Sequence, residues 1–302
     1  MESTAPAPLG VIAHYNLLER LDPAGPGDLY RARDTHRGRT VTIRLLPDSF
    51  EADPDSRRAF IARAQTMTAM SHPNVTTVFD VGEQDGRLYL VFEFLKGQSL
   101  RAEMAGRAMN VRRAVELAIQ MGDAIADAHA AGFIHGGLSP DSIVITAKGH
   151  AKIPPLEFAT RGGFDQNEAA SRLSDYDSPE EARGEPADER SDIYSIGAML
   201  YEMLSTRRPQ HRGAAAPSVS NRHVPPEVDD IVLRAVAPNP NSRLQSAATF
   251  AAELRSVSAI LDVRGGASDE DQGDPPAANV GRAVIMTLVI LAAIGLLVWM
   301  VV

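Results

Sequence analysis

Two short polar stretches contain side chains that could do chemistry: residues 135–142, which read HGGLSPDS, and residues 154–158, which read PPLEF. Each offers one carboxylate, Asp141 or Glu157, and a carboxylate can act as a general base or bind a hard cation such as Mg²⁺. The chain has no cysteine, which excludes thiolate nucleophiles, thiolate metal sites and disulfides. Its formal net charge of −9 argues against nucleic acid as a main partner, because phosphate backbones are bound by clustered basic residues.

The secondary structure that must position these stretches is predicted to change along the chain from strands to helices. Strand-like apolar runs separated by Gly and Asp turns fill the first 95 residues, with one helix expected near residues 54–70. After Gly97 the apolar spacing becomes helical, most clearly over residues 111–131 and 192–204. The sequence therefore predicts an α+β protein, in which a small strand-rich lobe precedes a larger helical lobe.

The order of these segments resembles the bacterial serine/threonine protein kinases. The motifs that carry the resemblance are HPNV, LYLVFEFLKG, IHGGLSPDSIVI, SPEEARGEPADERSDIYSIGAMLYEML and NSRLQSAATFAAEL. The resemblance covers residues 14–260 and implies a two-lobed kinase-like fold, with an N-lobe over 14–95 and a C-lobe over 96–260. Residues 1–13 are predicted to be an N-terminal tail. The family's activity would be transfer of phosphate from ATP to serine or threonine.

The resemblance implies that the phosphate-binding positions of the N-lobe have changed. Of the family's three glycines over the ATP phosphates only Gly27 remains, while Asp22 and Ala24 occupy the other two positions. The phosphate-binding lysine falls on Arg44, and the helix glutamate that pairs with it falls on Arg63. Two like charges cannot form the usual ion pair. Two outcomes are open: the helix swings outward, or both guanidinium groups turn to solvent.

The catalytic positions of the C-lobe have changed as well. The family's base aspartate falls on Gly137, its catalytic-loop lysine on Ser139, its second metal ligand on Ser142 and its magnesium-binding aspartate on Pro155. Losing base, lysine and metal ligands together removes most of the charge stabilisation that phosphoryl transfer needs. We therefore expect a catalytically inactive homologue, a pseudokinase, with no required cofactor and no Mg²⁺ site.

Two carboxylates offer weak replacements for the lost groups. Asp141 could act as a base, although the family's residue at this position points away from the substrate, and Glu157 could bind magnesium from two residues beyond Pro155. An enzyme with residual ATP-dependent phosphotransferase activity is therefore one alternative. A second alternative is a nucleotide sensor that binds ATP weakly without hydrolysing it. Its adenine pocket would be formed by Leu21, Leu29, Thr42, Glu93, Leu95 and Val144.

The resemblance also implies that the residues bracing the fold are kept. His135 belongs to the internal stack, Asp192 holds the catalytic loop, and Glu180 and Arg243 form a buried ion pair. The segment between Leu204 and Pro217 is expected to be too short for the family's extra helix. Hydroxyl groups near the SPE motif, Tyr176 among them, could accept phosphate from another kinase.

The end of the chain predicts a membrane anchor. Residues 283–302 contain no charge and would span about 30 Å as a helix, the thickness of a hydrocarbon core. Residues 261–282 read as an acidic flexible linker. Arg264 and Arg282 favour a cytoplasmic position for the body. Our leading interpretation is a pseudokinase at the cytoplasmic membrane that binds a protein partner, such as an active kinase or a membrane complex, and acts as a scaffold or regulator.

Overall fold

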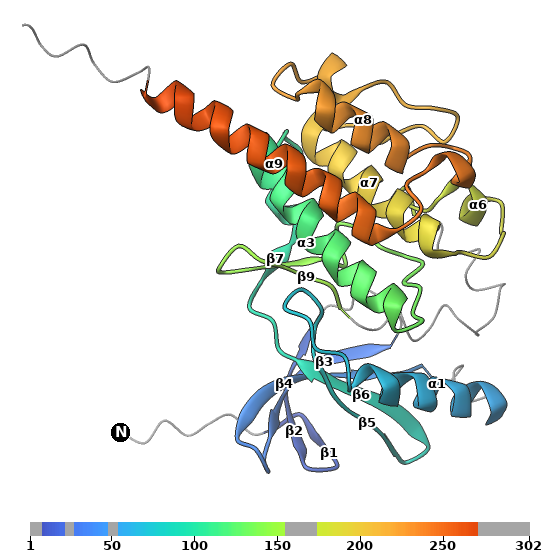
Figure 1. Ribbon diagram of the computed structural model, residues 1–302. Helices are drawn as coiled ribbons and strands as arrows, with labels where there is room; N and C mark the ends of the chain where they lie inside the picture. Colours follow the sequence, from blue (N-terminus) through green and yellow to red (C-terminus); the bar gives the residue numbers. More distant parts are fainter. Residues whose placement is uncertain (1–7, 22–26, 48–53, 155–173, 271–302) are drawn as a thin grey trace, which may run out of the picture. The chain divides into compact units, whose positions relative to one another are not determined.

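The computed structural model describes residues 8–21, 27–47, 54–154 and 174–270. The chain divides into two units, Met1–Ser258 and Ala259–Val302. The first unit contains a β-rich lobe followed by a helical lobe, which confirms the kinase-like fold expected from the sequence (Figure 1).

The N-lobe is built on a six-stranded antiparallel sheet in the order β1-β2-β3-β4-β6-β5. Helix α1 (Pro54–Met67) packs against β5. The strands are β1 (Gly10–Ile12), β2 (Tyr15–Leu21), β3 (Asp28–Asp34), β4 (Arg39–Leu45), β5 (Val78–Gln84) and β6 (Arg87–Glu93).

Alternation along β4 decides which of its side chains share a face of the sheet. Val41 and Ile43 belong to the hydrophobic cluster on one face of the sheet, where both are fully buried. Because successive side chains of a strand point to opposite faces, Thr42 and Arg44 share the other face. Both are buried as well, with 4% of each residue exposed.

The C-lobe consists mainly of helices and carries a small three-stranded sheet beside α2 and α3, in the order β7-β8-β9 (Figure 1). Its strands are β7 (Gly97–Ser99), β8 (Val144–Thr146) and β9 (Ala151–Lys152). The helices are α2 (Leu100–Met104), α3 (Val111–Ala130), α6 (Pro179–Ala182), α7 (Glu189–Ser205), α8 (Pro226–Ala235) and α9 (Ala247–Glu270), with 3-10 turns η2 (Pro217–Val219) and η3 (Pro240–Ser242).

Two glycines allow the C-lobe helices to approach closely. A Cβ at Gly197 of α7 would lie 2.6 Å from the Cβ of Ala235 on α8, and a Cβ at Gly122 of α3 would lie 3.1 Å from the Cβ of Ala251 on α9. Heavy atoms of packed side chains do not approach to 2.6 Å, so the spacing of α7 and α8 depends on the missing side chain. α7 is consequently buried almost along its whole length.

The HPNV segment joins the two lobes through hydrogen bonds. Thr76 N–H donates to the Ile153 carbonyl at 2.9 Å, and Ile153 N–H donates to the Asn74 carbonyl at 2.8 Å. The side-chain amide of Asn74 donates to Gln120 of α3 at 3.1 Å and to the Ala151 carbonyl at 2.8 Å. Asn74 therefore holds the segment before β5 against α3 and the residues that follow β8.

After α7, one sequence prediction is confirmed and another is wrong. Residues 206–225 are all described and contain η2 but no α-helix, as the short segment predicted. The linker predicted to begin at residue 261 is wrong over its first ten residues, because α9 continues as a helix through Glu270. Each residue added to a formed helix gains one hydrogen bond, which lets α9 continue past Ser258 even though Asp262 and Val263 are weak helix formers.

The predicted membrane span, residues 283–302, lies outside the described residues. Within the part of the chain that is described, no helix combines the length and the apolar character needed to cross a bilayer.

Candidate active site

The loop that follows α3 is held from behind by the carboxylate of Asp192. This side chain, near the start of α7, is fully buried and accepts hydrogen bonds from His135 N–H at 2.9 Å and Gly136 N–H at 2.7 Å. His129 Nε2 lies 2.8 Å from the same carboxylate. Gly136 has a φ of 61°, a left-handed conformation that favours glycine. One buried carboxylate therefore sets the backbone path of the loop.

The hydroxyl of Ser142 closes the other end of this loop. Ser142 Oγ donates to the Ser139 carbonyl at 2.9 Å and accepts from Ser139 N–H at 3.3 Å, and only 7% of Ser142 is exposed. The side chain at the family's second metal-ligand position is thus engaged inside the loop. Gly137, at the base position, lies half-buried and provides no carboxylate.

Asp141 lies on the side of the loop that faces α2. Its carboxylate is 60% exposed and pairs with Arg101 Nη2 at 3.4 Å. Arg101 also bonds to Glu202 of α7 at 3.0 Å and donates to the hydroxyl of Tyr176. The Asp141 carboxylate is therefore engaged by Arg101 in this structure.

The two arginines of the N-lobe do not turn to solvent together. Arg44 is buried on β4, so the alternative that exposed both guanidinium groups is wrong for this residue. Arg63 on α1 is partly buried, and its guanidinium carbon lies 5.7 Å from the centre of the Phe133 ring at the start of the catalytic loop. A cation over an aromatic face is attractive, so the ring offers Arg63 a stabilising site that a glutamate would not use.

Among the residues predicted to surround adenine, one pair lies side by side in the N-lobe sheet and another pair meets at the hinge, residues 93–95, between β6 and β7. Leu21 and Leu29 lie opposite each other in the β2–β3 ladder, and the Thr42 hydroxyl donates to the Glu93 carbonyl at 3.5 Å. Leu95 follows directly after β6. In the C-lobe, Val144 lies opposite Lys152 in the β8–β9 ladder.

Lys152 is a site residue that sequence reasoning missed. Its Nζ lies 2.8 Å from the Glu93 carboxylate and donates to the Val75 carbonyl at 3.3 Å. Only 15% of its side chain is exposed. The sequence contained a signal for this residue. Lys152 lies between Ala151 and Ile153 in the short strand HAKI, and alternation places its side chain on the face opposite to theirs.

The ion pair between Glu180 and Arg243 is buried at the base of the site. Its two hydrogen bonds measure 2.5 and 2.6 Å, and Ser191 Oγ donates to the same carboxylate at 2.9 Å. Burial alone would raise the pKa of Glu180, but hydrogen bonds from Arg243, the backbone and Ser191 outweigh it and lower the pKa to about 2. Glu180 therefore stays ionised, as the sequence predicted for this pair.

Tyr176 is buried between two arginines rather than exposed. Arg101 and Arg208 lie over its ring at 5.3 and 5.4 Å, and its hydroxyl donates to Glu202. Only 2% of the residue is exposed, and burial raises the pKa of its hydroxyl. The expectation that Tyr176 could accept phosphate is wrong for this conformation. Isolated motifs did not reveal the cluster, because its members are far apart in sequence.

Several predicted positions lie outside the described residues, namely Asp22, Ala24, Pro155 and Glu157. His135, predicted to belong to the internal stack, is fully buried, and Met67 of α1 is 1% exposed. Within the described ranges, no three His, Asp or Glu side chains gather in a way that could hold a metal ion.

Fold and site together define a member of the protein kinase family. The family described as "Protein kinase domain" matches residues 15–254. The chain belongs to this family. By fold it is similar to the kinase domain of Mycobacterium tuberculosis PknI, with a TM-score of 0.67, 21% identity, and coverage of 83% of this chain and 99% of that one.

Curated relatives are bacterial serine/threonine kinases. The chain is 34% identical to PknB of Mycolicibacterium smegmatis, covering 80% of this chain and 42% of the relative. It is 33% identical to the probable serine/threonine kinase SCO3848 of Streptomyces coelicolor, covering 77% and 38%. It is 32% identical to PknA of Mycobacterium tuberculosis, covering 81% and 61%. The chain thus spans about two to three fifths of the length of these relatives.

These relatives correct the expectation that the chain is not an enzyme. A kinase domain that is 32–34% identical to proteins named serine/threonine kinases indicates a member of an enzyme family. The changes at Gly137, Ser139 and Ser142 alone do not remove the chain from that class.

Proposed function

We propose that this kinase-family chain is a membrane-anchored regulator in a bacterial serine/threonine kinase signalling pathway, and that it acts by binding a protein partner. The partner would be an active kinase or a membrane complex. The observation that carries the proposal is the buried bracing of the C-lobe, in which Asp192 holds the loop and Glu180 pairs with Arg243. Removing one member of a buried pair costs about 3–5 kcal/mol, so both members support a rigid platform.

The membrane anchor belongs to the same proposal. Residues 283–302 are uncharged over the length that a bilayer core requires, and Arg264 and Arg282 precede them. The kinase-like body would then face the cytoplasm. A tether of this kind raises the local concentration of the body beside other membrane proteins, which increases binding without any new contact.

Affinity capture tests the regulatory role. The tagged full-length chain is cross-linked in intact membranes, purified in mild detergent and analysed by mass spectrometry, with an unrelated tagged single-span protein as the control. We expect one protein partner to be retained in near-stoichiometric amount. Recovery of no protein above the control in repeated captures would contradict the proposal.

A phosphotransferase is the second candidate function, favoured by the similarity to named serine/threonine kinases. Its test is phosphate incorporation from radiolabelled ATP into the chain itself or a generic protein substrate, compared with a heat-denatured control. In an active preparation, Asp141→Ala and Glu157→Ala would show whether either carboxylate contributes. An unchanged rate removes that residue from the reaction.

A third candidate is a nucleotide sensor, supported by the pairing of Leu21 with Leu29 in the β2–β3 ladder and of Val144 with Lys152 in the β8–β9 ladder. Weak ATP binding without a requirement for Mg²⁺ would identify it. A thermal-shift titration with ATP, in the presence and absence of magnesium, measures this directly, since a ligand that binds only the folded state raises the melting temperature. The absence of a shift at millimolar ATP would exclude useful binding.

A further inference from the structure

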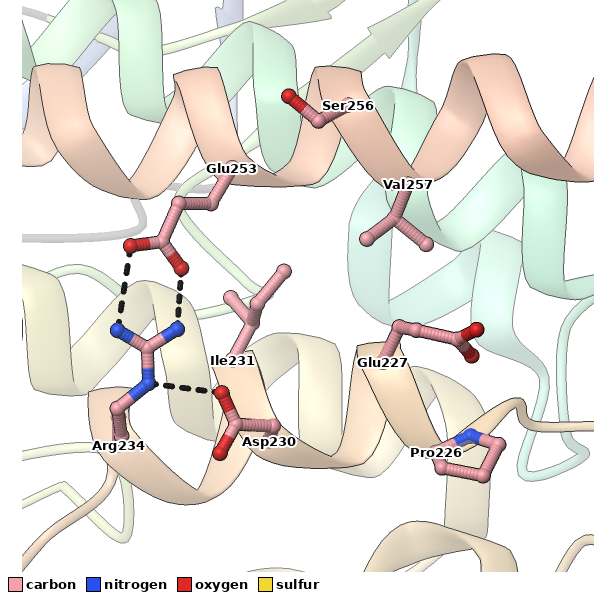
Figure 2. Close-up of a pocket in the computed structure, with 8 residues that line it drawn as sticks. All are labelled: Pro226, Glu227, Asp230, Ile231, Arg234, Glu253, Ser256 and Val257. Carbon is pink, nitrogen blue, oxygen red and sulfur yellow. Dashed lines mark hydrogen bonds and ion pairs between the residues drawn. The ribbon is translucent and has the colours of Figure 1, made fainter.

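A groove with an apolar floor and acidic walls runs between α8 and the first half of α9. It has a volume of about 480 Å³ and is lined by Pro226, Glu227, Asp230, Ile231, Arg234, Glu253, Ser256 and Val257 (Figure 2). The lining residues of α8 repeat every three to four positions, so they share the face of the helix that is turned toward α9. The groove is far from the catalytic loop in the sequence and shares no residue with the site described above.

The floor of the groove is formed by aliphatic side chains. Ile231 and Val257 approach each other from the two helices and are 3% and 7% exposed (Figure 2). Ser256, beside Val257, is exposed at the rim. The lining of the groove taken together is mostly apolar, so an aliphatic side chain of a bound segment would be removed from water there.

The walls of the groove are acidic. Glu227, Asp230 and Glu253 contribute three carboxylates and Arg234 one guanidinium, which leaves two negative charges. Arg234 bonds to Asp230 at 3.0 Å and to Glu253 at 3.1 Å, and Figure 2 shows it held between both carboxylates. The Asp230 side chain remains 70% exposed. Asp230 and Glu253 are thus placed so that both can bond to one guanidinium group, here that of Arg234.

We propose that this groove docks a segment of a partner protein that presents an aliphatic side chain flanked by lysine or arginine. Charge complementarity selects the occupant, because anionic lipid surfaces and nucleic acids would be repelled by the acidic walls. The inference names the surface for the partner binding proposed above and rests on that function. A partner's cation would meet Asp230 at the rim while its aliphatic side chain packs on Ile231 and Val257.

The direct test measures binding of a defined probe to the full-length chain in neutral detergent. The probe is a fluorescein-labelled 15-residue amphipathic peptide with leucines on one face and lysines and arginines on the other. A second peptide carries glutamates in place of the basic residues. Fluorescence anisotropy should show saturable binding of the basic peptide, weakened by added salt, and none of the acidic peptide. Absence of saturable binding by the basic peptide overturns the proposal.

Three variants locate the binding. Asp230→Lys reverses a charge of the wall, and Ser256→Phe fills the groove from an exposed position. Asp55→Lys is the matched control, because Asp55 also forms an exposed helical pair with an arginine, but on α1. We expect at least tenfold weaker binding in the first two variants and less than a twofold change in the control. Equal weakening in all three variants overturns the proposal.

The same variants separate this inference from the proposed function. If the partner is still captured from membranes by Asp230→Lys and by Ser256→Phe, the groove is not the docking surface, although the regulatory role stands. If the basic peptide binds but the wild-type chain captures no partner, the regulatory role fails while the groove is supported. An increase in molar mass with concentration that Asp230→Lys abolishes would overturn the proposal by showing that a second copy occupies the groove.

Discussion

The hydroxyl of Thr42 lies 3.5 Å from the backbone carbonyl of Glu93 and donates to it. The same glutamate receives Lys152 on its carboxylate and directs its backbone N–H to the Thr77 carbonyl at 2.9 Å. The polar groups of Glu93 at the hinge are therefore all engaged inside the protein. A bound adenine that used the carbonyl would have to compete with the Thr42 hydroxyl.

Replacing Thr42 should reveal this competition. Thr42→Val removes the hydroxyl and keeps the shape, so the Glu93 carbonyl becomes available to a nucleotide. One neutral hydrogen bond contributes about 0.5–1.5 kcal/mol, and we expect ATP affinity to rise roughly twofold to tenfold. Titration with a fluorescent ATP analogue measures the change. Thr42→Ser retains the hydroxyl and is the control; a gain of equal size there would show that the hydrogen bond is irrelevant.

Breaking the pair between Glu180 and Arg243 should destabilise the C-lobe strongly. In Glu180→Ala the guanidinium of Arg243, which is fully buried, loses its counter-charge. Such uncompensated charges cost about 3–5 kcal/mol. Urea unfolding followed by circular dichroism gives the difference in free energy. Glu185→Ala, which removes an exposed carboxylate nearby, should change the free energy of unfolding by less than about 0.5 kcal/mol.

The same pair predicts a dependence of stability on pH. The pKa of Glu180 is lowered from 4.5 to about 2 in the folded state, so its contribution is fully present above pH 4.5. It is lost progressively as the pH falls from about 4.5 to 2, because the unfolded chain takes up the proton first. The loss is on the order of 3 kcal/mol.

Comparing the wild type with Glu180→Gln isolates this contribution. Glutamine does not titrate, so the free energy of unfolding of the variant should fall less steeply between pH 5 and pH 2.5. Urea unfolding at several pH values provides the two curves. Parallel curves would show that Glu180 has the same pKa in the folded and unfolded chain.

The contact at Gly197 predicts the effect of a single methyl group. Alanine is favoured over glycine in a helix by about 1 kcal/mol, but its Cβ would meet that of Ala235 at 2.6 Å. Overpacking typically costs 1–3 kcal/mol, so Gly197→Ala should be destabilising by about 1 kcal/mol. Thermal unfolding measures the sign. Gly10→Ala, whose Cβ would meet Leu17 at an ordinary 3.7 Å, is the control.

The sequence predicted the fold and the bracing residues because both depend on local patterns. Apolar spacing identified the strand lobe and the helical lobe, and motif positions identified Asp192, Glu180 and Arg243. Contacts between segments distant in the chain were not predictable in this way. Lys152 reaches Glu93 across 59 residues, and Tyr176 is buried by arginines from α2 and from the loop after α7.

The errors have physical causes of the same kind. Arg44 was allowed to be exposed because arginine is rarely buried, yet the pleat of β4 fixes its side chain on the inner face with Thr42. The linker was predicted to begin at residue 261 because two glycines follow shortly after it. In the structure these glycines lie inside α9, which continues to Glu270. Inactivity was inferred from individual side chains, whereas the similarity of the whole domain indicates an enzyme family.

The contacts of Asp192 separate the path of the catalytic loop from the side chains that the loop displays. Its carboxylate grips backbone N–H groups and His129, none of which depends on what residues 137, 139 or 142 are. The backbone of His135 and Gly136 is therefore held without any contribution from those three side chains. Replacing Gly137 or Ser139 should therefore leave the hydrogen bonds of Asp192 in place, whereas replacing Ser142 would remove the hydroxyl that bonds to the Ser139 backbone.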